Sequence, residues 1–195
     1  MLPASQATCC RRKPGAWASD PVIETEQTAR VRGGIDGVWS YVQDIARWAE
    51  IMPGYRESTL IDADTSHWTL KVGVGGLVRT VKVHVHVDEW AGPGLVRFTY
   101  KLAGDPVQGS GTYRATAISP TETDIALAVR VEGSGPMAPM WEAMGRPLLP
   151  QFARQFAEQL RDRIEEALGV PEAPAAAPAG LLQRLWAWLR RMLGR

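Results

Sequence analysis

The sequence contains few of the side chains on which metal sites and most catalytic groups depend. Its 195 residues include two cysteines and three histidines. Cys9 and Cys10 are adjacent, a spacing that rarely allows a disulfide and matches no zinc motif, so we predict a reducing cytoplasm and no bound metal. No run of about 20 apolar residues could span a bilayer. The formal net charge of +1 does not indicate a nucleic-acid partner.

The histidines and serines form no recognisable catalytic arrangement. His84 and His86 are two residues apart in an alternating segment, which places both on the solvated face of a strand. Two histidines without a third ligand make a weak metal site, and we expect His67 beside a turn. Ser110 and Ser134 lie in glycine-rich segments without an obvious base. The sequence therefore predicts no catalytic residue.

The two ends of the chain differ in composition from its middle. Residues 1–20 hold a short basic run with no apolar run after it, so they match no secretory or twin-arginine signal and are predicted to be a disordered lead. Residues 169–180, GVPEAPAAAPAG, contain three prolines that block a helix, which predicts a semi-extended linker. One domain over residues 21–168 remains, long enough to bury a sizeable core.

The last fifteen residues, 181–195, are predicted to form an amphipathic membrane-binding helix. At about 100° per residue, the apolar side chains fall on one arc and the arginines on the other, with no acidic residue among them. Such a helix fits the membrane interface, with arginines at anionic headgroups, which predicts a peripheral location on the inner face of the cell membrane. A helix that docks in a partner's groove, or on its own domain, would share the pattern. The residues predicted to contact the membrane are Leu181, Leu182, Arg184, Leu185, Trp186, Trp188, Leu189, Arg190, Arg191, Met192, Leu193 and Arg195.

The middle of the chain has the pattern of an antiparallel sheet. Residues 22–31 alternate as a first strand, and residues 35–52 have helical spacing that ends at Pro53 and Gly54. Further alternating segments follow, with inward apolar rows at residues 68–74, 81–87, 96–102, 109–115 and 125–131 and a turn at Gly75-Gly76. One apolar and one solvated face are therefore expected.

A long helix is predicted to close the domain. Its early part, residues 137–144, is expected to be broken from the rest by Pro147 and Pro150, and the helix is expected to be regular from Gln151 to Leu168. One apolar stripe has near-fourfold spacing: Met140, Met144, Leu148, Phe152, Phe156, Leu160 and Ile164. Glu165 and the other charged residues are expected to be solvated. The fold class is α+β, a curved antiparallel sheet wrapped around a long C-terminal helix.

This order of elements resembles the helix-grip fold of the START-like (SRPBCC) superfamily. The segment VWSYVQDIARWAEIMPGYRES is similar to the start of polyketide cyclase and coenzyme Q-binding proteins. The segment WTLKVGVGGLVRTVKVHVHVDEWAGP resembles more closely a carbon-monoxide-dehydrogenase subunit family, in which a proline-glycine pair ends the second helix and some members carry a linker and amphipathic tail. The resemblance implies a carrier of an apolar molecule, such as a quinone, beside membrane-linked oxidoreductases.

The residues themselves also indicate an apolar cavity between sheet and helix. Methionines cluster at the helix ends, where such a fold opens, and several aromatic rings could stack on an aromatic ligand. Gly109 and Gly111 would leave room on the inner face, although a filled core would use the same residues. The predicted ligand-binding residues are Met52, Tyr55, Leu70, Val83, Val85, Phe98, Tyr100, Gly111, Tyr113, Leu127, Met137, Met140, Met144, Leu148, Phe152 and Phe156.

The predicted function is a membrane-tethered carrier of a quinone or other isoprenoid or lipid, and not an enzyme. Its expected partners are the hydrophobic ligand, the membrane surface and a membrane-linked oxidoreductase, with no nucleic acid and no cofactor other than a carried quinone. One alternative is a polyketide cyclase- or aromatase-like enzyme, and another is a scaffold whose tail recruits a partner enzyme to the membrane. Polar side chains inside the cavity would favour the enzyme, and an apolar lining would favour the carrier.

Overall fold

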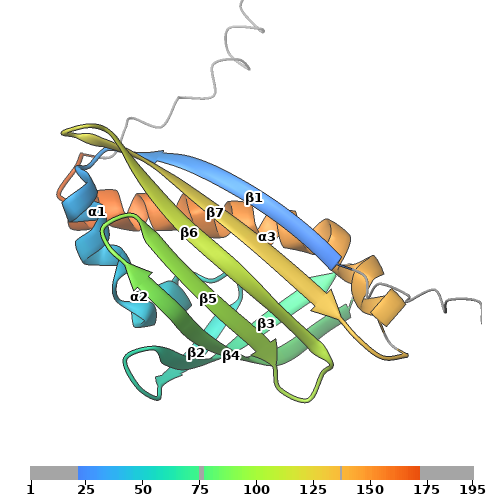
Figure 1. Cartoon of the computed structure of the whole chain (residues 1–195). Coiled ribbons are helices and arrows are strands. Elements are labelled where there is room, and N and C mark those ends of the chain that lie inside the picture. The colour runs from blue at the N-terminus through green and yellow to red at the C-terminus, as the bar shows by residue number, and fades with distance from the viewer. Residues whose placement is uncertain (1–21, 75–76, 137, 172–195) are drawn as a thin grey trace, which may run out of the picture.

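The computed structural model describes residues 22–74, 77–136 and 138–171, which form one antiparallel sheet and three helices (Figure 1). The elements are β1 (Val22–Val31), α1 (Ile35–Val42), α2 (Ile45–Glu50), β2 (Tyr55–Leu60), β3 (Thr65–Val74), β4 (Leu77–Ala91), β5 (Leu95–Leu102), β6 (Val107–Ser119), β7 (Glu122–Gly133) and α3 (Ala138–Ala167). This confirms the predicted order of elements and the α+β class. The N-terminal lead, the Gly75-Gly76 turn, Met137, all of the linker after Pro171 and the tail at 181–195 lie outside the described residues.

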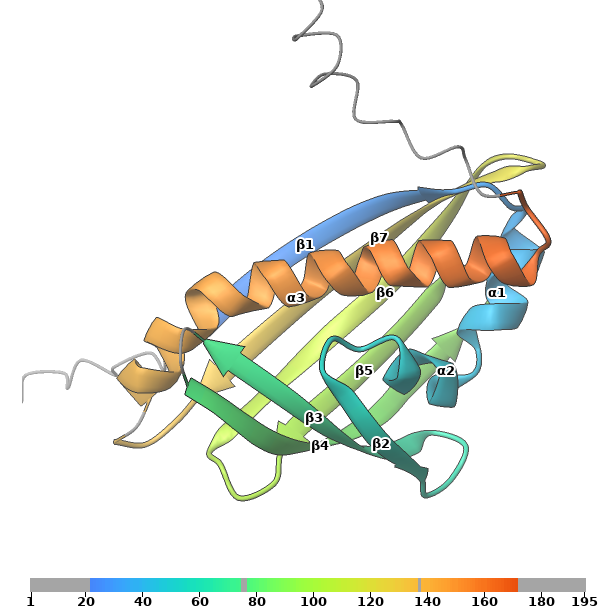
Figure 2. The same ribbon diagram turned by 180° about the vertical axis from the view of Figure 1, so that it is seen from behind.

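The sheet has the strand order β1-β7-β6-β5-β4-β3-β2, and every neighbouring pair is antiparallel. Seen from both sides, it curves around α3, while α1 and α2 cover one end (Figures 1 and 2). The long chain of hydrogen-bonded strands and the single long helix therefore form two layers, as the helix-grip resemblance implied.

Two local features fix how α2 and β2 connect. The Asp44 side chain caps α2 by accepting a hydrogen bond from the backbone N–H of Ala46 at 3.0 Å. Gly54 then turns the chain with φ of 80°, and a Cβ atom at this position would overlap the carbonyl of Lys71 on β3. The Gly54 carbonyl in turn accepts from the Lys71 N–H at 2.7 Å. Only glycine fits this close approach, which brings β2 alongside β3.

The core follows the alternation of the strands. Four valines of β4, at positions 81, 83, 85 and 87, are buried on the concave face. At the end covered by α1 and α2, Val38, Val42 and Ile164 are fully buried and close the space between the layers. The apolar stripe of α3 completes this end with Phe156 and Leu160.

Helix α3 runs without interruption from Ala138 to Ala167, so the predicted break at the prolines is wrong. Pro147 and Pro150 each remove one backbone N–H donor and crowd the preceding turn, and a helix can accommodate this by bending. The first turns of α3 lie at an angle to the rest in both views (Figures 1 and 2). The stripe also ends sooner than predicted, because Met140 is 40% exposed. Within the described residues, no helix is long and apolar enough to cross a membrane.

Glu165 is not the solvated charge that the helical pattern predicts. It is 8% exposed, and its carboxylate joins α3 to the chain that follows β1. Oε1 accepts from the backbone N–H of Arg32 at 2.9 Å, while Oε2 accepts from Nε and Nη2 of the same residue at 3.0 and 2.6 Å. Burial alone would raise the pKa of Glu165, but the bonds from Arg32 outweigh it and hold the pKa below its ordinary value.

Candidate functional site

An apolar cavity of about 260 Å³ lies between the concave face of the sheet and α3. It is far larger than the space one water molecule needs, so the core is not filled. Among the described residues, no charged side chain lines it. The lining residues are Trp48, Met52, Trp68, Leu70, Val72, Val81, Val83, Val85, Phe98, Tyr100, Leu102, Val107, Leu127, Val129, Val131, Trp141, Met144, Gly145, Leu148, Leu149, Phe152, Ala153 and Phe156.

The two ends of the cavity differ in burial. Toward α1 and α2, the lining residues Trp48 and Phe156 are 2% and 5% exposed. Toward the start of α3, the lining residues Trp141, Met144 and Leu148 are only half-buried. The cavity is therefore closed by the short helices and opens beside the first turns of α3, which we call the mouth.

Most of the predicted ligand-binding residues line this cavity: Met52, Leu70, Val83, Val85, Phe98, Tyr100, Leu127, Met144, Leu148, Phe152 and Phe156. Gly111, Tyr113, Tyr55 and Met140 do not, and Met137 lies outside the described residues. Whether the lining residues bind a ligand remains a prediction.

The prediction missed several wall residues, above all three tryptophans. Trp68 and Val81 lie in the same alternating rows as predicted residues, so strand alternation alone could have identified them. Trp48 lay in the helical pattern of residues 35–52. Trp141 had no such signal, because its place depends on the bend of α3.

The two inner-face glycines do not leave the empty space that their position in the strand pattern suggested. A Cβ atom at Gly111 would overlap the ring of Phe98, and one at Gly109 would overlap the ring of Tyr100. These residues are cross-strand partners between β5 and β6, so each aromatic ring lies over the glycine opposite it. The Tyr100 hydroxyl reaches on to β7, where it donates to the carbonyl of Arg130 at 3.0 Å. The glycines thus let both rings lie across the sheet.

Trp48 forms the inner wall together with other aromatic rings. Its ring contacts those of Phe98 and Phe156 edge-on, with centroids 5.6 and 6.1 Å apart. Its indole N–H donates to the carbonyl of Val42 at 2.8 Å, so the one polar atom of this side chain is satisfied. The closed end therefore presents aromatic surface to a ligand.

Tyr113 is buried beside this cluster rather than exposed to the cavity. It is 1% exposed, and its ring centroid lies 6.1 Å from that of Trp48. Among the described residues, its hydroxyl has no hydrogen-bond partner. Burial raises the pKa of this hydroxyl well above its ordinary value, so it stays protonated.

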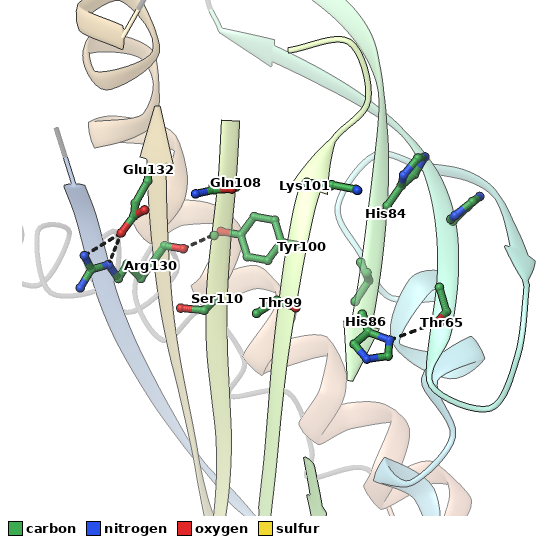
Figure 3. A pocket seen from close by; sticks show the side chains of 13 residues that line it. Thr65, His84, His86, Thr99, Tyr100, Lys101, Gln108, Ser110, Arg130 and Glu132 are labelled. Carbon is green, nitrogen blue, oxygen red and sulfur yellow. Dashed lines mark hydrogen bonds and ion pairs between the residues drawn. The ribbon is translucent and has the colours of Figure 1, made fainter. Parts of the chain in front are cut away.

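A second hollow, of about 590 Å³, lies on the convex face of the sheet and is polar (Figure 3). His84 and His86 line it, which confirms their predicted position on the solvated face. His67 lies within β3 and not beside a turn, because it pairs with His84, whose ring centroid is 4.0 Å away. Burial, and next the charge of His67, lower the pKa of His84. Thr65 and His86 form a hydrogen bond of 3.0 Å.

The convex hollow offers less for ligand binding than the cavity does. Its side chains satisfy one another, and Glu132 on β7 pairs with Arg130 at 2.6 Å (Figure 3). Three or more histidine, cysteine or carboxylate side chains that could hold a metal do not come together anywhere in the described residues. An apolar molecule would gain little here, because none of the described elements covers this face as a second layer. The cavity is therefore the candidate site.

The chain belongs to the family described as polyketide cyclase / dehydrase and lipid transport, which matches residues 22–165. No curated protein matches it. The narrower resemblance to a carbon-monoxide-dehydrogenase subunit family remains a prediction.

Solved structures with the same fold are numerous. A conserved protein from Geobacillus kaustophilus is 18% identical, with a TM-score of 0.65 over 74% of this chain and 97% of that one. A START superfamily protein from Mycobacterium smegmatis is 14% identical, with a TM-score of 0.57 over 73% and 97%. The Zhui aromatase/cyclase from a Streptomyces species is 17% identical, with a TM-score of 0.54 over 80% and 99%. Family membership and the apolar cavity together indicate a hydrophobic small-molecule ligand, and the family description covers both enzymes and lipid transport.

Proposed function

We propose that this protein is a carrier that binds a hydrophobic small molecule in the cavity between the sheet and α3. The observation that carries the proposal is the lining itself: among the described residues it holds no charged side chain, and its one tyrosine hydroxyl, that of Tyr100, already donates to the backbone. Such a wall can remove apolar surface from water but offers no acid or base to a reaction. This favours a carrier over the cyclase-like alternative.

The carried molecule is proposed to be a quinone or another isoprenoid. The rings of Phe98 and Tyr100, which lie across the sheet, and the edge of Trp48 offer aromatic surface to a planar head. The membrane is the proposed source of the ligand. The amphipathic pattern of residues 181–195 supports tethering there, and a membrane-linked oxidoreductase would be the recipient.

Binding is tested with the neutral fluorescent probe N-phenyl-1-naphthylamine. The wild-type protein should bind it, and Ala153→Leu should weaken binding because Ala153 is buried and lines the cavity. Ala157→Leu is the matched control, since Ala157 is buried one turn further along α3 and does not line the cavity. Both variants overpack a buried site, so their melting temperatures separate lost stability from lost space. Equal probe binding by the two variants would contradict the proposal.

The identity of the ligand and the role of the tail need separate measurements. Organic extraction and native mass spectrometry of the purified protein should show an isoprenoid or quinone, and a polyketide product would favour the cyclase instead. For the tail, full-length protein should sediment with anionic vesicles at low salt. Replacement of Leu185, Trp188 and Leu189 by Ser should abolish that, since each buried CH₂ contributes about 0.8 kcal/mol. Protein that stays in the supernatant would favour the scaffold or partner-docking alternative.

A further inference from the structure

One charged side chain occupies the inward-facing row of β4 at the mouth of the cavity. Arg79 precedes Val81 and Val83 in that row, and its register partner on β3 is Val72, which lines the cavity. Its guanidinium carbon lies 5.6 Å from the ring centroid of Trp141, a lining residue of α3. Arg79 therefore lies between the sheet and the helix at the point where the cavity opens.

The guanidinium is held from one side only. Nη2 donates to Asp105 in the turn between β5 and β6, at 3.0 Å from Oδ1 and 2.8 Å from Oδ2. The Asp105 side chain is 13% exposed and so gives a fixed anchor, whereas that of Arg79 is 50% exposed. Nε and Nη1 make no hydrogen bond to any of the described residues. Because a guanidinium carries five N–H donors, it can hold Asp105 and a second acceptor at once.

The cavity wall determines what that acceptor can be. An amphiphile cannot place a polar head against a wall without polar partners, because each unpaired polar group would lose its bonds to water. Its head must therefore lie at the mouth, where Arg79 offers donors and positive charge beside the apolar face of Trp141. On α3, the nearby Glu142 and Arg146 form an ion pair with each other and cancel in charge. A carboxylate matches the remaining donors better than a neutral head does.

We propose that Arg79 binds the carboxylate of a single-chain amphiphile whose tail fills the cavity, so that the protein selects long-chain acids over the matching neutral molecules. This inference rests on the proposed carrier function and adds the chemical class of the head group and its orientation. The head faces the mouth, and Asp105 positions the guanidinium without touching the ligand.

The test compares dodecanoic acid with 1-dodecanol, two ligands of equal chain length. Each displaces N-phenyl-1-naphthylamine from the protein at pH 8, where the acid is ionised. The wild-type protein should bind the acid at least tenfold more tightly than the alcohol. Arg79→Gln should weaken the acid by about tenfold and the alcohol by less than twofold, since charge-assisted bonds are the ones lost. Arg79→Lys should recover part of the preference.

The control is Arg97→Gln, which removes the same charge from a strand arginine on the convex face that also pairs with one carboxylate, Glu89, at 2.8 Å. It should leave both ligands unchanged. The acid-to-alcohol ratio is the readout, because loss of the contact with Trp141 could loosen the mouth for every ligand alike. Equal affinity for acid and alcohol, or an equal loss of both in Arg79→Gln, would overturn the head-group site alone. Failure of the wild-type protein to bind the neutral probe would overturn the carrier function and this inference with it.

Discussion

Replacing Glu165 by Gln should destabilise the domain at neutral pH, although a helical pattern places this residue among surface charges. The carboxylate accepts three hydrogen bonds from Arg32, two of them from the guanidinium. Hydrogen bonds to charged groups contribute about 1.5–3 kcal/mol. Because Arg32 is partly exposed and would regain water, the lower part of this range applies to Glu165→Gln, about 2 kcal/mol. For a domain of this size, that corresponds to a fall of about 4–8 °C in melting temperature.

The loss should also depend on pH in a defined direction. The folded-state pKa of Glu165 lies below its ordinary value, so its stabilisation is complete above the pKa of the unfolded chain and disappears as pH falls through the folded-state pKa. The melting temperatures of wild-type protein and Glu165→Gln should therefore converge in acid. Glu166→Gln is the control, because Glu166 is exposed and pairs with Arg163 one turn away. Equal losses in the two variants, or a gap that stays constant into acid, would refute the reasoning.

Three further predictions concern the sheet. Gly111→Ala should lower the unfolding free energy by about 1–3 kcal/mol and weaken probe binding, since it displaces the Phe98 ring, and both effects should shrink in a Phe98→Ala background when measured as a double-mutant cycle. Tyr113→Phe should be neutral or stabilising by up to about 1 kcal/mol in chemical denaturation, because it removes a buried hydroxyl that has no partner among the described residues, and a clear loss would reveal a hidden partner. His84→Ala and His86→Ala should each stay within about 0.5 kcal/mol and leave probe binding intact, whereas a large loss of binding would reopen a role for the convex face.

The strands and the fold could be predicted because alternation is a local signal. The valines of β4 at 81, 83, 85 and 87 show their buried face without any knowledge of their partners. The same logic found most of the cavity wall, since a residue in an inward row lines whatever space exists there. It could not decide between a cavity and a filled core, because both require the same apolar rows.

The errors arose where the outcome depends on distant partners. Glu165 has the spacing of a surface charge, and its partner Arg32 is 133 positions away in the chain. The rings that fill the positions opposite Gly109 and Gly111 depend on the register between β5 and β6, which the sequence does not specify. The prolines of α3 were expected to break a helix, but packing against the sheet favours a bent continuous helix over two separate ones.

Helix α3 therefore divides into a half that stabilises the fold and a half that shapes the ligand site, and the two can be separated by one matched pair of substitutions. Leu160 is 1% exposed at the closed end, so Leu160→Ala should lower the unfolding free energy by about 2–5 kcal/mol while the cavity wall stays intact. Leu148 is half-buried and lines the cavity near the mouth, so Leu148→Ala should cost less stability but change the affinity for the neutral probe. Chemical denaturation and probe titration on both variants measure the two effects. If Leu148→Ala proved the more destabilising variant and left probe binding unchanged, the first half of α3 would be part of the core, and the cavity would not be a ligand site.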